Sequence, residues 1–122
     1  MPGRTALAAA RFHFGRGELK SARAQLQWVV ERSPSEDLRD LARLRLAEVL
    51  LDEKEYDAAL GQLEAKPLEA YAAQFAALKG DVMVAKNLPA EARAAYQLAL
   101  DQAGSAGALR DSIQMRLDAL GG

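Results

Sequence analysis

The residue types that could do chemistry are few in this sequence of 122 residues. It contains one histidine, His13, and no cysteine, which excludes disulfides, thiolate metal sites and cysteine nucleophiles. His13 falls on the expected inward face of an amphipathic helix, where a structural histidine is far more common than a catalytic base. The carboxylates Asp52, Glu53 and Glu55 gather in an expected turn, which favours solvated charges over a metal or acid–base site.

No phosphate-binding or nucleophile motif accompanies these residues. Gly15 and Gly17 follow a helical pattern and do not fit the spacing of a dinucleotide-binding or P-loop glycine motif. A G-x-S-x-G nucleophile elbow is also missing. Charged residues make up 27% of the chain, sum to a net charge of −1 and form no basic stripe for nucleic acid. We therefore predict no enzymatic activity, no cofactor and no metal, and expect a protein-binding surface instead.

The elements that must carry such a surface are helices. Residues 41–63 read as a helix, a short charged turn and a second helix, because apolar residues recur at spacings of three and four on both sides of the turn. The chain is rich in alanine and poor in β-branched residues, which favours helix over sheet. No run of 18 apolar residues is present, so no membrane-spanning helix is expected within this sequence.

The helix pair recurs along the chain. Ala22, Ala59 and Ala92 occupy equivalent places, with spacings of 37 and 33 residues, which bracket the ~34-residue period of the tetratricopeptide repeat. Short side chains at such positions let two antiparallel helices approach closely. The first copy also has the small residue, turn glycine and terminal proline of that repeat, at Ala10, Gly17 and Pro34. The pattern predicts an all-α fold: an αα-solenoid of about three tetratricopeptide-like helix pairs plus a C-terminal capping helix.

We expect seven helices and no strand. Ser33 is predicted to cap the third helix, with Pro34 at its first position, and Asn87 to take a left-handed conformation after the fifth. Residues 1–5 should be loose and residues 6–122 should form the domain, which the abrupt helical start suggests is a fragment of a longer chain. The expected helices cover residues 6–14, 18–32, 34–52, 56–65, 68–86, 89–102 and 109–120.

The first helix of each pair is expected to line the concave side of the solenoid. Phe14, Leu51 and Val84 recur at the same place in the three copies, and one interpretation is an apolar groove for an extended or helical peptide. Contact between adjacent repeats is the alternative, and it is the more common role of such positions. The predicted partner-binding residues of this concave face are Arg11, Phe14, Leu44, Glu48, Leu51, Gln74, Asp81 and Val84.

Five short words, in a fixed order and spacing, carry a resemblance to a known family. With them the chain resembles, from about Ala6 to Leu120, the bacterial YfgM-like proteins, which are ancillary subunits of the SecYEG translocon. The turn at Asn87 departs from the Gly-Asp that the family tends to have there. The words are LRLA at 44–47, DAAL at 57–60, LKGD at 78–81, ARAAY at 92–96 and QMRL at 114–117.

The resemblance implies a function and a location. It implies the periplasmic domain of a single-pass inner-membrane protein, with a chaperone-like adaptor role in protein export. The implied partners are the Sec translocon, a membrane-anchored periplasmic chaperone of the prolyl-isomerase type, and emerging polypeptides. The residues alone leave another class open, a general tetratricopeptide scaffold in the cytoplasm.

Overall fold

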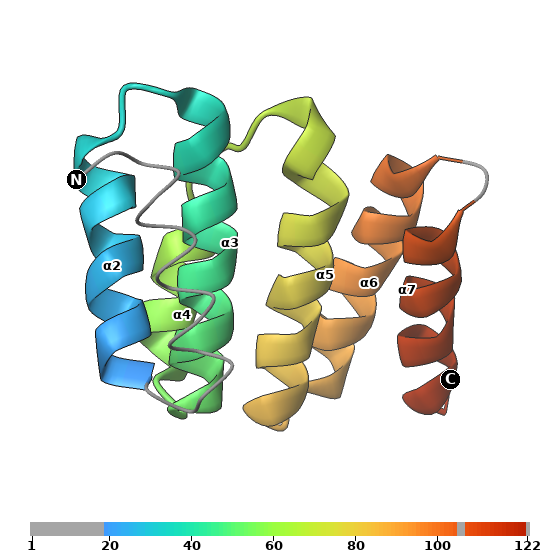
Figure 1. The fold of residues 1–122 in the computed structure, drawn as a ribbon. Coiled ribbons are helices and arrows are strands. Elements are labelled where there is room, and N and C mark those ends of the chain that lie inside the picture. The colour runs from blue at the N-terminus through green and yellow to red at the C-terminus, as the bar shows by residue number, and fades with distance from the viewer. Residues whose placement is uncertain (1–18, 105–106, 122) are drawn as a thin grey trace. The chain divides into compact units, whose positions relative to one another are not determined.

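The computed structural model describes residues 19–104 and 107–121 of the chain. Over those residues every regular element is an α-helix and none is a strand, which confirms the predicted all-α fold class (Figure 1). The expected first helix, with His13, lies outside the described residues. The helices are α2 (Leu19–Arg32), α3 (Glu36–Asp52), α4 (Tyr56–Leu63), α5 (Glu69–Ala85), α6 (Pro89–Ala103) and α7 (Ala108–Ala119).

The chain divides into two compact units, Met1–Leu68 and Glu69–Gly122. In the first unit, α3 packs against both α2 and α4. In the second unit, α5 and α6 form an antiparallel pair and α7 packs on α6 (Figure 1). Each of the pairs α3–α4 and α5–α6 is therefore a helical hairpin of the predicted kind.

The small residues that defined the repeat lie at the packed faces of the helices. Ala22, Ala59 and Ala92 each have 0% of their surface exposed, which confirms their predicted burial. Ala92 belongs to a cluster that also contains Ala76 and Ala77 of α5, so short side chains meet from both helices of that pair. Such contacts allow close approach of the two helix backbones and leave little room for a larger side chain.

The two hairpins close with the same turn. Lys54 and Asn87 both have positive φ, 63° and 62°, and stand 33 residues apart, like Ala59 and Ala92. In each turn the left-handed residue donates its N–H to the carbonyl three residues earlier, and the next N–H reaches back five residues, at 2.8–2.9 Å. This is the Schellman arrangement that satisfies the last carbonyls of a helix. The prediction for Asn87 is confirmed, whereas Lys54 was not foreseen because the turn contains no glycine or asparagine.

The predicted start of the third helix is wrong by two residues. Ser35, not Ser33, is the N-cap of α3, and its hydroxyl accepts from the N–H of Leu38 at 3.2 Å. The hydroxyl of Ser33 is used elsewhere, because it accepts the N–H of Ser35 at 3.2 Å. The backbone of Ser33 extends α2, since its N–H donates to the carbonyl of Val29, and its carbonyl accepts from Arg39. Pro34 consequently precedes the helix instead of opening it.

A buried carboxylate holds the end of the first unit. Asp40, on α3, is 1% exposed. One of its oxygens accepts the backbone N–H of Leu68 at 2.8 Å, and the other pairs with Arg43 at 3.2 Å. A buried carboxylate without such donors would be strongly unfavourable, so both contacts are needed to keep Asp40 inside. The bond to Leu68 fixes the segment that leads from α4 toward α5.

Candidate protein-interaction site

The eight predicted partner-binding residues have different surroundings. Leu44 is 5% exposed and belongs to the core, whereas Leu51 and Gln74 are half-buried. Glu48 is half-buried and forms an ion pair with Arg45 at 3.2 Å. Val84 is 44% exposed and offers an open apolar side chain. The remaining three are Asp81, which is described below, and Arg11 and Phe14, which lie outside the described residues.

Leu51 and Val84 are equivalent positions of the two hairpins. Each lies in the last turn of the first helix of its pair, and they stand 33 residues apart. Leu44, Glu48 and Leu51 belong to the first unit, and Gln74, Asp81 and Val84 belong to the second. Each unit therefore presents its own part of the predicted surface.

Asp81 is the centre of a polar cluster that joins all three helices of the second unit. Its Oδ1 accepts the hydroxyl proton of Tyr96, on α6, with an O···O distance of 2.6 Å. Its Oδ2 pairs with Arg116, on α7, at 3.0 Å. Arg116 also donates to the hydroxyl of Ser112 one turn earlier on α7. Asp81 therefore links α5 to both of its neighbours with a single carboxylate.

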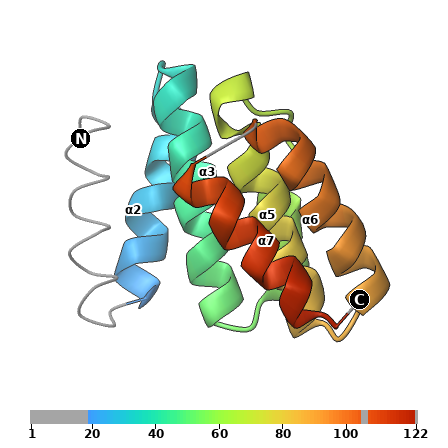
Figure 2. The same ribbon diagram turned by 90° about the vertical axis from the view of Figure 1, so that its right-hand side faces the viewer.

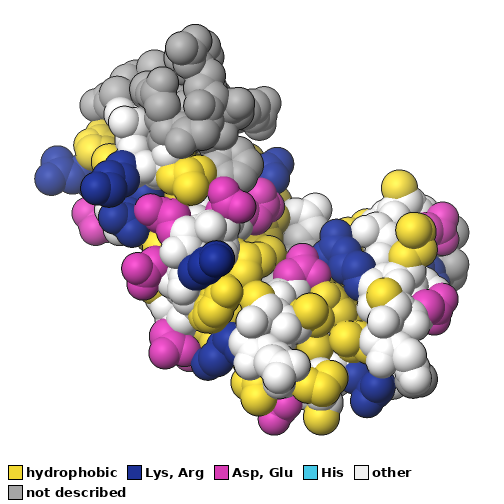
Figure 3. All heavy atoms as spheres, turned by 90° about the horizontal axis from the view of Figure 1, so that it is seen from below, with side chains coloured by type: hydrophobic (Ala, Val, Ile, Leu, Met, Phe, Trp, Pro, Cys, Tyr) yellow, Lys and Arg dark blue, Asp and Glu magenta, His cyan; other side chains and the backbone are white. Residues whose placement is uncertain are grey.

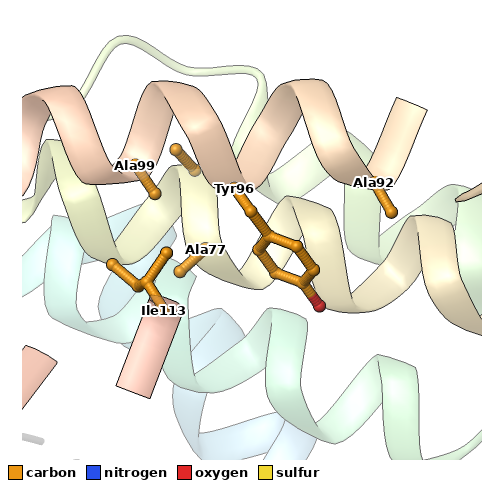
Figure 4. Packing of buried hydrophobic residues seen from close by; sticks show 6 residues of the cluster. Ala77, Ala92, Tyr96, Ala99 and Ile113 are labelled. Atoms are coloured by element: carbon orange, nitrogen blue, oxygen red, sulfur yellow. The ribbon is translucent and has the colours of Figure 1, made fainter. Parts of the chain in front are cut away.

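Gly80 makes room for this cluster. A Cβ at Gly80 would lie within 3.0 Å of three atoms of the Tyr96 ring. The ring can pass this close to the α5 backbone only because residue 80 has no side chain. Tyr96 is 2% exposed, and Figure 4 shows its ring between the two helices.

The hydroxyl of Tyr96 acts as a fixed donor. Burial raises the pKa of Tyr96 well above its usual range, and the hydrogen bond to Asp81 acts in the same direction, while the positive charge of Arg116 opposes it. A phenol with a raised pKa stays protonated at neutral pH. The cluster therefore has the character of a structural link and not that of a general base or nucleophile.

Apolar contacts also hold α7 against the α5–α6 pair. Ile113 is 0% exposed and lies beside Ala77, in one cluster with Ala99 (Figure 4). The backbone of α7 packs against α6, and α7 lies in front of the α5–α6 pair in the view of Figure 2. Further apolar side chains of α7 pack partly buried against the same cluster, namely Leu109, Leu117 and Leu120.

Three of the five sequence words meet in this one place. The word LKGD supplies Gly80 and Asp81, ARAAY supplies Tyr96, and QMRL supplies Arg116. In the sequence these words indicated only a family resemblance, and the contact between their residues was not predicted. A signal was available, because a tyrosine, an acid and an arginine placed on successive amphipathic helices can satisfy one another when the helices pack.

The described surface carries mixed charges. On the face shown in Figure 3, basic and acidic side chains are interspersed, with hydrophobic side chains between them. Among residues 19–104 and 107–121, no three His, Cys, Asp or Glu side chains gather as a metal site would require. In the same ranges, no helix combines the length and hydropathy that crossing a bilayer demands. The large apolar side chains that remain exposed are Val84, Leu98 and Met115.

Comparison with known proteins identifies a family and two relatives that this chain resembles. Residues 2–122 match the family model of the tetratricopeptide repeat-like domain. The chain is 36% identical over 115 residues to the "Ancillary SecYEG translocon subunit" of Neisseria gonorrhoeae, covering 93% of this chain and 54% of that protein. It is 32% identical over 114 residues to the protein of the same name from Escherichia coli, covering 93% and 55%. No solved structure matches significantly.

The chain spans about half the length of these curated relatives. Their names agree with the resemblance that the five words carried, which is thereby confirmed. The match of the family model extends over nearly every residue and agrees with the paired helices of both units. The chain belongs to the tetratricopeptide repeat-like domain family.

Proposed function

We propose that this domain is a non-catalytic adaptor that binds proteins during export through the Sec translocon. The observation that carries the proposal is the similarity, over 93% of the chain, to two proteins named as ancillary subunits of that translocon. The helix pairs support it, because tetratricopeptide-like repeats expose extended surfaces suited to protein ligands. The interspersed surface charges favour short-lived contacts over strong electrostatic capture.

The finer parts of the proposal concern place and partners. In the full-length protein the domain is tethered to the inner membrane and faces the periplasm, where it acts as a chaperone-like adaptor. Its partners are the translocon itself, a membrane-anchored chaperone of the prolyl-isomerase type, and polypeptides that emerge from the channel. The support for these parts is the family resemblance, since charge and composition do not distinguish one compartment from another.

The contact surface in this proposal uses the outer parts of the first helices of the pairs. Val84 is its most accessible apolar side chain, and Leu51 is the equivalent residue of the other hairpin. Leu44 supports this surface from the core, and Asp81 supports it from the polar cluster. The other members of the proposed surface are Arg11, Phe14, Glu48 and Gln74.

Capture of the translocon from cells tests the surface. Full-length protein carrying Val84→Asp should retain about one fifth of the translocon that the unchanged protein retains in mild detergent, because an apolar contact worth about 1 kcal/mol is lost. Ala85→Asp is the matched control, since Ala85 is also exposed and lies in the same last turn of α5. Equal capture by the two variants would move the binding surface away from Val84.

Protease accessibility in spheroplasts tests the location. If the proposal holds, protease added from outside cleaves this domain in the full-length protein, and the protein fractionates with the inner membrane. A domain that stays protected and appears in the cytosolic fraction would favour the cytoplasmic scaffold instead. The two measurements are independent of the Val84 variant.

A further inference from the structure

We propose that the seat of α7 on the α5–α6 pair is also a binding site for an amphipathic helix of a partner protein, with α7 as its built-in occupant. The inference rests on the proposed function in one respect, namely that the domain binds proteins. It adds which surface receives the ligand and what the ligand looks like. The seat is defined by Ala77, Ala99, Asp81 and the partly buried Met83 and Leu100.

The contacts of α7 make an exchangeable occupant physically reasonable. Ile113 is the one residue of α7 that is fully buried, while its other apolar side chains are partly exposed. A helix of 12 residues is marginal on its own in water, so α7 depends on the seat for its structure. Four residues, 104–107, separate α6 from α7 in the sequence, so α7 stays near the α5–α6 pair.

The seat also shows which helix it selects. Ile113, Leu117 and Leu120 recur at i, i+4 and i+7, the spacing of anchors in helix-in-groove recognition. Arg116, at i+3, meets Asp81, whose other oxygen is already held by the hydroxyl of Tyr96. Because Asp81 is fixed in place before any ligand arrives, the seat favours a helix with apolar anchors at this spacing and an arginine three residues after the first anchor.

A fluorescent peptide of residues 107–121 serves as the probe, and its anisotropy is measured against the full chain. Arg116→Ala in the chain removes the ion pair between its own α7 and Asp81, so α7 competes less well with the peptide. We expect the peptide to bind this variant about fivefold more tightly than the unchanged chain. Gln114→Ala is the matched control, because Gln114 is exposed and bonds to Asp118 on α7 itself. Equal affinity for all three chains, or no binding to any of them, would overturn the proposal.

Reversal of the charge pair tests selectivity. A chain with Asp81→Lys should prefer a peptide carrying Arg116→Glu over the unchanged peptide, whereas the unchanged chain should show the opposite preference. If circular dichroism shows that Asp81→Lys does not fold, Asp81→Asn replaces it and should abolish the preference. Two peptides that bind every chain alike would overturn the assigned role of Asp81.

The peptide-binding test and the translocon-capture test can fail independently of each other. Failed peptide exchange with intact translocon capture removes the inference and leaves the adaptor role standing. Successful exchange without any translocon capture keeps the seat and removes the adaptor role.

Discussion

Two glycines lie inside the described helices, Gly61 in α4 and Gly80 in α5, and their surroundings are opposite. A Cβ at Gly61 would meet nothing within 4 Å, whereas one at Gly80 would collide with the Tyr96 ring. Glycine costs about 1 kcal/mol relative to alanine inside a helix at either place. At Gly80 the close approach of Tyr96 and its bond to Asp81 offset that cost, while at Gly61 no contact within the described chain does so.

The comparison teaches that the two hairpins reach close packing by different means. In the second unit a glycine of the first helix admits an aromatic ring from the second. Buried alanines such as Ala59 and Ala92 occur in both units, but in the first unit no side chain of the described residues presses against the glycine of α4. Substitutions at these positions separate the two solutions, and we take them from the largest expected effect to the smallest.

Gly80→Ala should lower the free energy of unfolding by about 2–3 kcal/mol. The added methyl forces the Tyr96 ring away from α5, which costs more than the gain in helix propensity returns. Urea denaturation followed by far-UV circular dichroism measures the loss. In the double variant with Tyr96→Leu the two losses should be less than additive, and strict additivity would contradict the proposed clash.

Ala59→Leu should cost about 2 kcal/mol, because Ala59 has 0% exposed surface and its neighbours leave no room for three more carbons. Ala58→Leu is the matched control, since Ala58 is exposed on the same helix and should tolerate the change within about 0.5 kcal/mol. Thermal and urea unfolding of the two variants give the difference. Equal stabilities would refute the alignment of Ala59 with Ala22 and Ala92.

Tyr96→Phe should cost about 1 kcal/mol. The change removes the donor of the 2.6 Å bond but keeps the ring beside Gly80, and Asp81 retains Arg116 and some access to water. Tyr56→Phe, at the half-buried first position of α4, is the control and should change stability by less than about 0.5 kcal/mol. A Tyr96→Phe chain as stable as the unchanged protein would mean that the hydroxyl contributes nothing to holding α5 and α6 together.

The raised pKa of Tyr96 predicts an alkaline loss of stability. Above the ordinary tyrosine pKa of 10.0 the unfolded chain releases this proton while the folded chain retains it, so stability contributed by Tyr96 is full below that pH and falls as pH rises through and beyond it. The fall should be shallower in Tyr96→Phe than in the unchanged chain. Unfolding midpoints between about pH 9 and pH 11 measure the two slopes, and parallel slopes would contradict the assigned shift.

Gly61→Ala should raise stability by about 0.5–1 kcal/mol, the smallest of these effects and opposite in sign to that of Gly80→Ala. The gain comes from the unfolded chain, which loses conformational freedom, because the new methyl makes no contact within 4 Å. Differential scanning calorimetry measures the rise in melting temperature. A destabilised variant would show that some neighbour occupies the space beside α4.

Local pattern was enough to predict most of the described helices. Periodic apolar residues placed α2, α4, α5, α6 and α7 to within a few residues, since the side-chain period of a helix is a property of neighbouring residues. The repeat spacing predicted the burial of Ala22, Ala59 and Ala92. The same spacing could have predicted the left-handed conformation of Lys54 from that of Asn87, although the turn at Lys54 contains no glycine or asparagine.

What the sequence could not determine depends on contacts between distant segments. The choice of cap for α3 was a local exception: Ser35 caps the helix, while the hydroxyl of Ser33 accepts the N–H of Ser35. In the candidate site, sequence identified Val84 as an apolar surface position but described Asp81 only as a face residue. Its bonds to Tyr96 and Arg116 span 15 and 35 residues, and they exist because three helices pack at one point. Periodicity determines which face of a helix is buried, but only tertiary packing decides which polar groups on that face find each other.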